Sequence, residues 1–223
     1  MRIHFLATVA LVGLVSVAEA QEAGYDWSGF YIGAHAGYAQ SSSDFDADAT
    51  DFAGKRDSDG FVGGVYVGHD WQNQNLVYGF VADFDGLSTD GFAFGDEEAL
   101  TGGKGEAYSY DIDWVATARA RIGFTATDRL LVYGTGGIAA ARFQATNYYD
   151  SWLDEPTESK FDGVKIGGVF GAGVEYGFAE NWSAKTEFLH HTFNAIKPGP
   201  GGSSGASFRP ELTTVKFGLA YRF

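Results

Sequence analysis

The sequence predicts an all-β protein, folded as an eight-stranded antiparallel up-and-down transmembrane β-barrel. Three observations support this fold class. Apolar and polar residues alternate along eight segments of about ten residues or more, a length that suits a tilted strand crossing a membrane. The connections between these segments alternate between short turns and long polar loops, and the chain ends on an aromatic residue, Phe223.

The connection lengths give the orientation of the barrel. The expected strands cover residues 28–39, 59–71, 76–86, 108–124, 129–143, 163–178, 181–193 and 212–223. Short turns are expected at Gln72–Asn75, Thr125–Asp128 and Ala179–Glu180, whereas the other connections run to about twenty residues. Short turns on the periplasmic rim and long loops outside are typical of outer-membrane barrels. All four prolines, Pro156, Pro198, Pro200 and Pro210, are expected in long loops because proline cannot donate to a strand ladder.

The chain divides into residues 1–20, expected to be a cleaved signal peptide, and residues 21–223, the outer-membrane β-barrel. A polar start with Arg2 and His4 is followed by an apolar run, Phe5–Val17, and by the cleavage pattern Ala18-Glu19-Ala20. The run is short for a transmembrane anchor. Cysteine is absent, which excludes disulfides, and the net charge of -14 argues against nucleic acid as a partner.

The alternation also predicts which side chains face lipid. On the last strand Val215, Phe217 and Leu219 share one face, and Lys216 and Arg222 share the other. A lipid-facing surface must be apolar, so charged residues are expected to point into the barrel, where they need partners. The candidate site is therefore a structural charge network in the lumen: Asp83, Asp85, Asp113, Arg119, Arg121, Lys165, Glu175, Lys185, Glu187 and Lys216.

Residues near the ends of the fourth and last strands are expected to behave differently. Ile112 is assigned to the lipid-facing side of the fourth strand together with Trp114. Asp111 and Arg222 have inward parity but are expected near the rims, in contact with water. Aromatic residues at strand ends are expected to form interfacial girdles: Phe30, Trp71, Trp114, Trp182 and Phe223.

Three stretches resemble a known family. Trp27-Ser28-Gly29-Phe30-Tyr31-Ile32-Gly33, Arg119–Phe124 and Gly171–Tyr176 resemble the first, fourth and sixth strands of small porin-family outer-membrane barrels, typified by alpha-proteobacterial surface antigens. The resemblance implies an OmpA/OmpX-like fold in the outer membrane of a Gram-negative bacterium. It also implies that Tyr221 and Phe223 are an assembly signal read by the barrel-assembly machinery. The implied partners are outer-membrane lipid, lipopolysaccharide and a surface or host partner at the loops.

Three patterns in the sequence could carry chemistry. Gly201–Gly205 matches a nucleophile-elbow pattern but lies in a glycine-serine loop, without the strand and helix that the elbow needs. Asp44, Asp46 and Asp48 lack the glycine and the closing glutamate of a calcium loop. His190-His191 has no evident serine and acid partners for lipid cleavage. The sequence therefore predicts no catalytic site, cofactor or metal.

The first three long loops are acidic. Residues 40–58, 86–107 and 144–162 carry net charges of -3, -4 and -4. Solubility at the cell surface explains this charge, and a partner surface is the functional alternative. We expect a structural and surface-interaction protein. The alternatives are a narrow diffusion porin, a surface receptor binding haem through His35, His69, His190 or His191, a soluble lipocalin-like carrier and a lipid-cleaving barrel enzyme.

Overall fold

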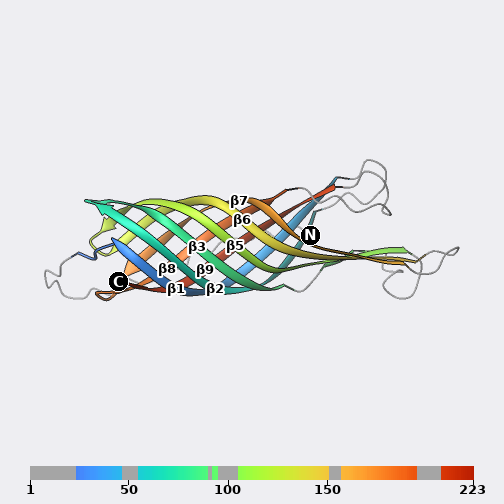
Figure 1. The fold of residues 1–223 in the computed structure, drawn as a ribbon, viewed down its shortest axis with the longest axis horizontal. Helices are drawn as coiled ribbons and strands as arrows, with labels where there is room; N and C mark the ends of the chain where they lie inside the picture. The colour runs from blue at the N-terminus through green and yellow to red at the C-terminus, as the bar shows by residue number, and fades with distance from the viewer. Residues whose placement is uncertain (1–23, 47–54, 90–91, 95–104, 151–156, 195–206) are drawn as a thin grey trace, which may run out of the picture.

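A computed structural model of the chain describes residues 24–46, 55–89, 92–94, 105–150, 157–194 and 207–223. Over these residues the chain forms only β-strands: β1 (Gly29–Asp46), β2 (Lys55–Asn73), β3 (Leu76–Thr89), β4 (Phe92–Phe94), β5 (Gly105–Thr127), β6 (Leu130–Asp150), β7 (Thr157–Gly177), β8 (Trp182–Phe193) and β9 (Ser207–Arg222). Each barrel strand pairs antiparallel with its neighbours, and the β3–β5 pairing closes the ring (Figure 1). The predicted eight-stranded up-and-down barrel is confirmed, with β4 as a short addition beside β5.

The strand register fixes the width of the barrel. Following paired residues once around the ring from Ile32 leads through Val67, Ala82, Ala118, Ile138, Gly168, Thr192 and Glu211 back to β1 at Ser42. The stagger is therefore ten residues, the difference between positions 32 and 42. An eight-stranded barrel has an interior just wide enough for side chains to fill it.

Several strands extend further toward the long-loop end than predicted. The pairing of β5 with β6 continues to Gly105 and Asp150, and β1 pairs with β9 as far as Asp46 and Ser207. These extensions project from the barrel body on the right of Figure 1. Sequence alternation misses them because no lipid-facing apolar residue marks strand continuation outside a membrane.

Pro210 corrects the expectation that every proline lies outside the strands. It lies within β9, opposite Ser43 of β1. The pairing of β8 with β9 ends one residue away, at Thr192 and Glu211. The β9 strand is therefore an edge strand at Pro210, the position where a missing N–H can be tolerated.

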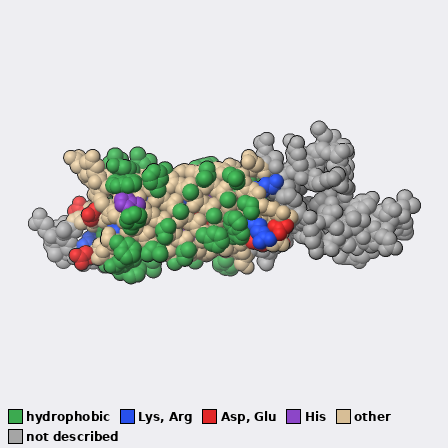
Figure 2. All heavy atoms as spheres, in the orientation of Figure 1, with side chains coloured by type: hydrophobic (Ala, Val, Ile, Leu, Met, Phe, Trp, Pro, Cys, Tyr) green, Lys and Arg blue, Asp and Glu red, His purple; other side chains and the backbone are tan. Residues whose placement is uncertain are grey.

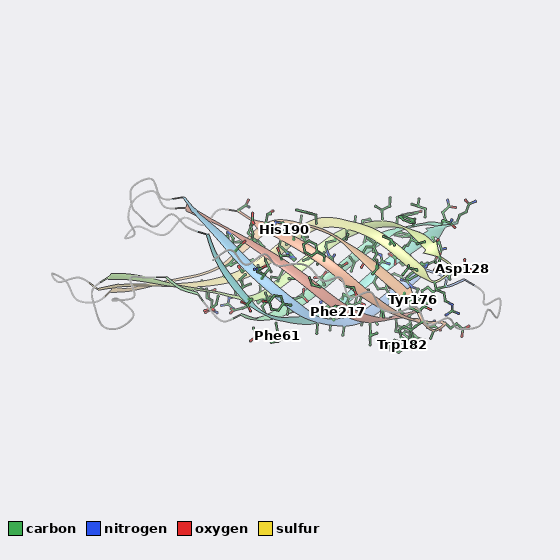
Figure 3. The ribbon with its side chains drawn as sticks, turned by 180° about the vertical axis from the view of Figure 1, so that it is seen from behind. Phe61, Asp128, Tyr176, Trp182, His190 and Phe217 are labelled. Carbon is green, nitrogen blue, oxygen red and sulfur yellow. The ribbon has the colours of Figure 1, made fainter. Side chains whose placement is uncertain are left out.

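The outer surface of the barrel is apolar. Phe61 is 76% exposed and Phe217 63% exposed, and every barrel strand contributes exposed large apolar residues to an outer belt. Figure 2 shows apolar side chains along the visible face. Phe61 lies toward one end of this belt, and Tyr176 and Trp182 lie toward the other (Figure 3). A lipocalin-like carrier would keep its apolar face inside, so this alternative is wrong.

No helix in the described part of the chain is long and apolar enough to cross a membrane.

Candidate functional site: the interior of the barrel

Arg121 organises the charged cluster nearest the short turns. Its Nε and Nη2 atoms lie 2.9 and 2.7 Å from the two carboxylate oxygens of Asp70, a bidentate pair. Its Nη1 atom donates to Glu175 Oε2 at 2.9 Å, and Ser183 Oγ donates to the other oxygen of Glu175 at 2.6 Å. All four side chains are buried. Hydrogen bonds to both oxygens of each carboxylate stabilise the ionised forms away from water.

Arg222 ties the end of the last strand into the same cluster. Its Nη2 atom lies 3.1 Å from Asp70 Oδ2, and its Nη1 atom donates to the backbone carbonyl oxygens of Trp27 and Gly29. The guanidinium carbon lies 4.7 Å from the centre of the Tyr31 ring. Arg222 is 3% exposed, so the expectation of a solvated arginine at the rim is wrong.

A second cluster is centred on Arg119. Its Nη2 atom lies 2.6 Å from Asp83 and 3.1 Å from Glu187. Thr117 Oγ1 accepts a hydrogen bond from Arg119 Nε at 3.0 Å and donates to Asp83 at 2.7 Å. Lys185 lies 3.7 Å from Glu187, so one carboxylate is shared by two cations.

Lys216 extends the second cluster toward His35. The Lys216 ammonium group lies 3.5 Å from Asp83 and is also paired with Asp85, which in turn contacts His35 Nε2. The His35 ring stacks on Tyr66 at 5.2 Å. Strands β1, β2, β3, β5, β7, β8 and β9 therefore all contribute to the two charged clusters.

Large inward side chains fit because neighbouring strands carry glycine beside them. The Tyr66 ring occupies the space where a Cβ atom of Gly33 would lie, and the Tyr31 ring does the same beside Gly68. A methyl group at Gly33 would collide with a buried aromatic ring that stacks on His35, so we expect Gly33→Ala to disturb the second cluster.

Apolar layers lie on both sides of the charged clusters. The upper apolar layer, toward the long loops, comprises Ala39, Val62, Leu87, Ile112, Val115, Ala139, Ala141, Phe143, Val169, Leu189, Phe193 and Leu212. All eight barrel strands contribute to it. The lower apolar layer, toward the short turns, comprises Tyr25, Trp27, Val77, Leu131 and Tyr133. The charged side chains are thus enclosed between two apolar layers.

The structure places eight of the ten proposed network residues in the two buried charged clusters of the interior: Asp83, Asp85, Arg119, Arg121, Glu175, Lys185, Glu187 and Lys216. Lys165 has the same inward parity but is only half-buried, opposite Ala141. The sequence did not predict that Asp70 and His35 belong to the charge network. The spacing Val62, Tyr66, Asp70 could have revealed Asp70, because every second residue of a strand shares its face.

The prediction that Asp113 points into the lumen is wrong, because β5 contains a bulge. The β5–β6 register shifts between Ile112 and Trp114, so the inward parity changes there and Ile112 is buried in the upper apolar layer. Asp113 instead lies 3.7 Å from Arg142, on a partly exposed surface. Arg142 also makes a bidentate pair with Asp162, at 2.9 and 2.6 Å. A bulge inserts one residue and reverses every inward and outward assignment beyond it.

The adjacent histidines point to opposite faces of β8. His190 Nδ1 lies 3.0 Å from Thr213 Oγ1 at the outer surface, where Figure 3 shows it, whereas His191 is buried with Nδ1 3.0 Å from the Leu212 carbonyl oxygen. The two rings cannot meet at one reacting group. Among the described residues, no three His, Asp or Glu side chains are grouped so as to hold a metal ion. The Gly201–Gly205 pattern lies outside the described residues.

A closed antiparallel barrel with an apolar outer belt and a polar interior defines an integral outer-membrane protein of Gram-negative bacteria. Residues 7–223 match the model of the outer membrane protein beta-barrel domain, and the chain belongs to this family.

Curated relatives agree with this assignment. The chain is 38% identical over 209 residues to a 31 kDa outer-membrane immunogenic protein of Brucella melitensis, covering 89% of this chain and 85% of the relative. It is 27% identical to a 22 kDa outer membrane protein of Rhizobium leguminosarum, covering 88% and 78%. It is 26% identical to a 25 kDa outer-membrane immunogenic protein of Brucella melitensis, covering 89% and 80%.

Proposed function

We propose that the protein is a structural outer-membrane barrel whose lumen does not conduct and whose activity is contact with partners at the cell surface. In this proposal the barrel is a rigid scaffold in lipid and lipopolysaccharide, it supports envelope integrity, and its acidic extracellular segments meet the partner. It is neither an enzyme nor a diffusion porin.

The observation that carries the proposal is the content of the lumen. Five buried acids, Asp70, Asp83, Asp85, Glu175 and Glu187, face five buried bases, Arg119, Arg121, Lys185, Lys216 and Arg222. Apolar layers lie above and below them. A diffusion porin needs a wide, water-filled path, which barrels of sixteen or more strands provide. Paired charges between apolar layers favour a plugged interior.

The strand extensions support the surface role. β5 has 23 residues and β6 and β7 have 21 each, about twice what a transmembrane strand requires. Their extracellular halves lie in or beside sequence with net negative charge. Two of the relatives are named immunogenic, a name that suits proteins exposed at the surface.

Planar-bilayer recording tests the plugged lumen. The wild-type protein is expected to show no stable open channel. Removing one central pair with Arg119→Ala and Glu187→Ala is expected to give measurable current, because it deletes two large side chains and the carboxylate that pairs with Lys185. The matched control is Arg142→Ala with Asp162→Ala, which removes an ion pair of the outer surface. A large, uniform wild-type conductance would make the diffusion porin the better proposal.

Deletion of the gene tests the envelope role. Cells without the protein are expected to become more sensitive to detergent, and a variant with residues 95–104 removed is expected to restore resistance because the barrel strands are intact. Surface contact, measured as binding of cells to host-cell or bacterial surfaces, is expected to fall in that variant. Unchanged detergent sensitivity in the deletion strain would contradict the envelope role.

A further inference from the structure

The residues before β1 cross the mouth of the barrel at the short-turn end. The backbone N–H of Tyr25 donates to the carbonyl oxygen of Asp128 at 2.9 Å, and Asp128 lies in the turn between β5 and β6. Around the ring these strands are three and four positions from β1, on the opposite wall. The Tyr25 ring also lies against Gly177, at the end of β7. The chain therefore spans the full width of the opening.

Trp27 anchors this crossing segment inside the barrel. It is fully buried at 0% exposure and packs with Tyr25, Val77 and Leu131 in the lower apolar layer. Its backbone N–H donates to Gln72 Oε1 at 2.9 Å, and its carbonyl oxygen accepts from Arg222. The Trp27 and Tyr25 rings are 4.5 Å apart. Contacts therefore join the segment to β2, β3, β6 and β9.

Gly29 makes the bend that turns the chain into the mouth. Its φ of 112° lies in a region that residues with a side chain rarely adopt, and a Cβ atom there would lie 2.9 Å from the carbonyl oxygen of Phe223. The neighbouring Phe30 carbonyl oxygen accepts from the N–H of Phe223 at 2.9 Å. The bend is thus built against the last residue of the chain, beside the one strand pair, β1 and β9, that no turn connects.

We propose that residues Tyr25–Ser28 form a strap that seals the periplasmic mouth of the barrel and locks the β1–β9 seam. The partners of the strap come from strands far apart in the chain, so they come together only when the barrel has closed. The strap therefore docks after closure, and it holds Arg222 and the β1–β9 pairing in place. The strap closes the short-turn end of the barrel, whereas the other apolar layer lies toward the long loops, so the strap adds a second barrier that does not depend on that layer.

The strap is tested with a single cysteine in the folded mature protein. The chain has no native cysteine, and Val77→Cys places a thiol in the lower apolar layer at a position that is 1% exposed. The rate of labelling by a membrane-impermeant maleimide then reports access through the periplasmic mouth. Trp27→Ala and Gly29→Ala are expected to raise this rate about tenfold or more, since each removes a feature that holds the strap.

Matched controls separate the strap from general destabilisation. Trp182→Ala removes a tryptophan from the lipid-facing surface, where it is 44% exposed. Gly86→Ala adds a methyl group where the nearest atom would lie 3.9 Å away. Neither is expected to change labelling. Heat-modifiable gel mobility identifies the folded fraction of each variant. If Trp27→Ala does not fold, Tyr25→Ala is used in its place.

Hydrogen exchange of the Phe223 amide, which donates to the Phe30 carbonyl oxygen of β1, tests the seam. In the strap variants exchange there is expected to accelerate, whereas amides of the β5–β6 ladder keep their wild-type rates. Equal labelling of Val77→Cys in strap variants, controls and wild type, with unchanged exchange at Phe223, would overturn the strap. A stable conducting wild-type channel would contradict both the plugged lumen and the sealed mouth, whereas unchanged labelling and exchange in a non-conducting protein would overturn the strap alone.

Discussion

At the scale of single residues, burial decides what an ion pair contributes. Arg121 and Arg142 each form a bidentate pair with an aspartate. The Arg121 side chain is 2% exposed and that of Arg142 is 42% exposed. Removing a buried partner leaves an unpaired charge away from water, whereas an exposed partner is replaced by water.

We therefore predict that Arg121→Ala lowers the free energy of unfolding by about 3–5 kcal/mol. The same substitution at Arg142 is expected to change it much less, because water replaces the partner of an exposed charge. Urea unfolding in lipid vesicles, followed by tryptophan fluorescence, measures both. Similar losses for the two variants would mean that water reaches Asp70 and Glu175 in the lumen.

The Arg142–Asp162 pair is exposed and lies beyond the exposed apolar side chains Ile138 of β6 and Val164 of β7, toward the long loops, so it is expected to respond to pH. The hydrogen bonds from Arg142 lower the pKa of the Asp162 carboxyl below its ordinary value of 3.8. Because the folded-state pKa is the lower one, any contribution of the pair to stability is present above the ordinary value and is lost as the pH falls through the folded-state pKa. Carboxyl NMR titration should show a depressed midpoint for Asp162, and Arg142→Gln should raise it. An equal midpoint in both proteins would contradict the pairing.

At the scale of strands, β5 and β9 depart from simple alternation for different reasons. In β5 the bulge at Ile112–Trp114 turns Ile112 inward and moves Asp113 out of the lumen. In β9 alternation holds from Leu212 to the end, with Phe217, Leu219 and Phe223 exposed and Leu212, Lys216 and Arg222 buried. Its final residues also contact the N-terminal strap, so this strand carries both the expected assembly signal and the seam.

Deleting Phe223 tests the assembly signal. We predict less heat-modifiable barrel in the outer membrane, because the terminal aromatic is the residue expected to be read by the barrel-assembly machinery. Phe217→Ala, a lipid-facing substitution within the same strand, is the control and is expected to keep most of the barrel. Quantitative immunoblotting of membrane fractions measures the amounts. Normal assembly without Phe223 would contradict its role as an assembly signal. The deleted residue would then matter only through its N–H bond to the Phe30 carbonyl oxygen, and the assembled variant would unfold faster than the wild type.

At the scale of the whole molecule, polarity is reversed relative to a soluble protein. Large apolar side chains are exposed on the outside, as Figure 2 shows for one face, and charged side chains lie inside. This arrangement is stable only in lipid, which supplies the apolar surroundings that the outer belt requires. The two ends of the barrel also differ, with short turns at one end and strand extensions at the other.

The difference between the two ends predicts the orientation in the cell. A single cysteine at Ser42 or Ser159 is expected to react with an impermeant maleimide on intact cells, and one at Asn73 or Thr127 is expected to react only after the outer membrane is permeabilised. The thiol-free wild type is the background control. Labelling at Asn73 with silence at Ser159 would reverse the orientation.

The sequence by itself determined the fold class, the approximate strands and most of the lumen charges. All three rest on alternation with a period of two residues and on the requirement that lipid-facing residues be apolar. Lys185 and Glu187 could be assigned in this way, since neighbouring apolar residues fix their parity. The tertiary structure alone decided the partners and the exceptions. Asp70 pairs with Arg121 and Arg222, 51 and 152 residues away, and no local pattern encodes a contact across a closed ring. The bulge in β5, the edge position of Pro210 and the strap at Trp27 depend likewise on which strands lie beside or opposite each residue once the barrel has closed.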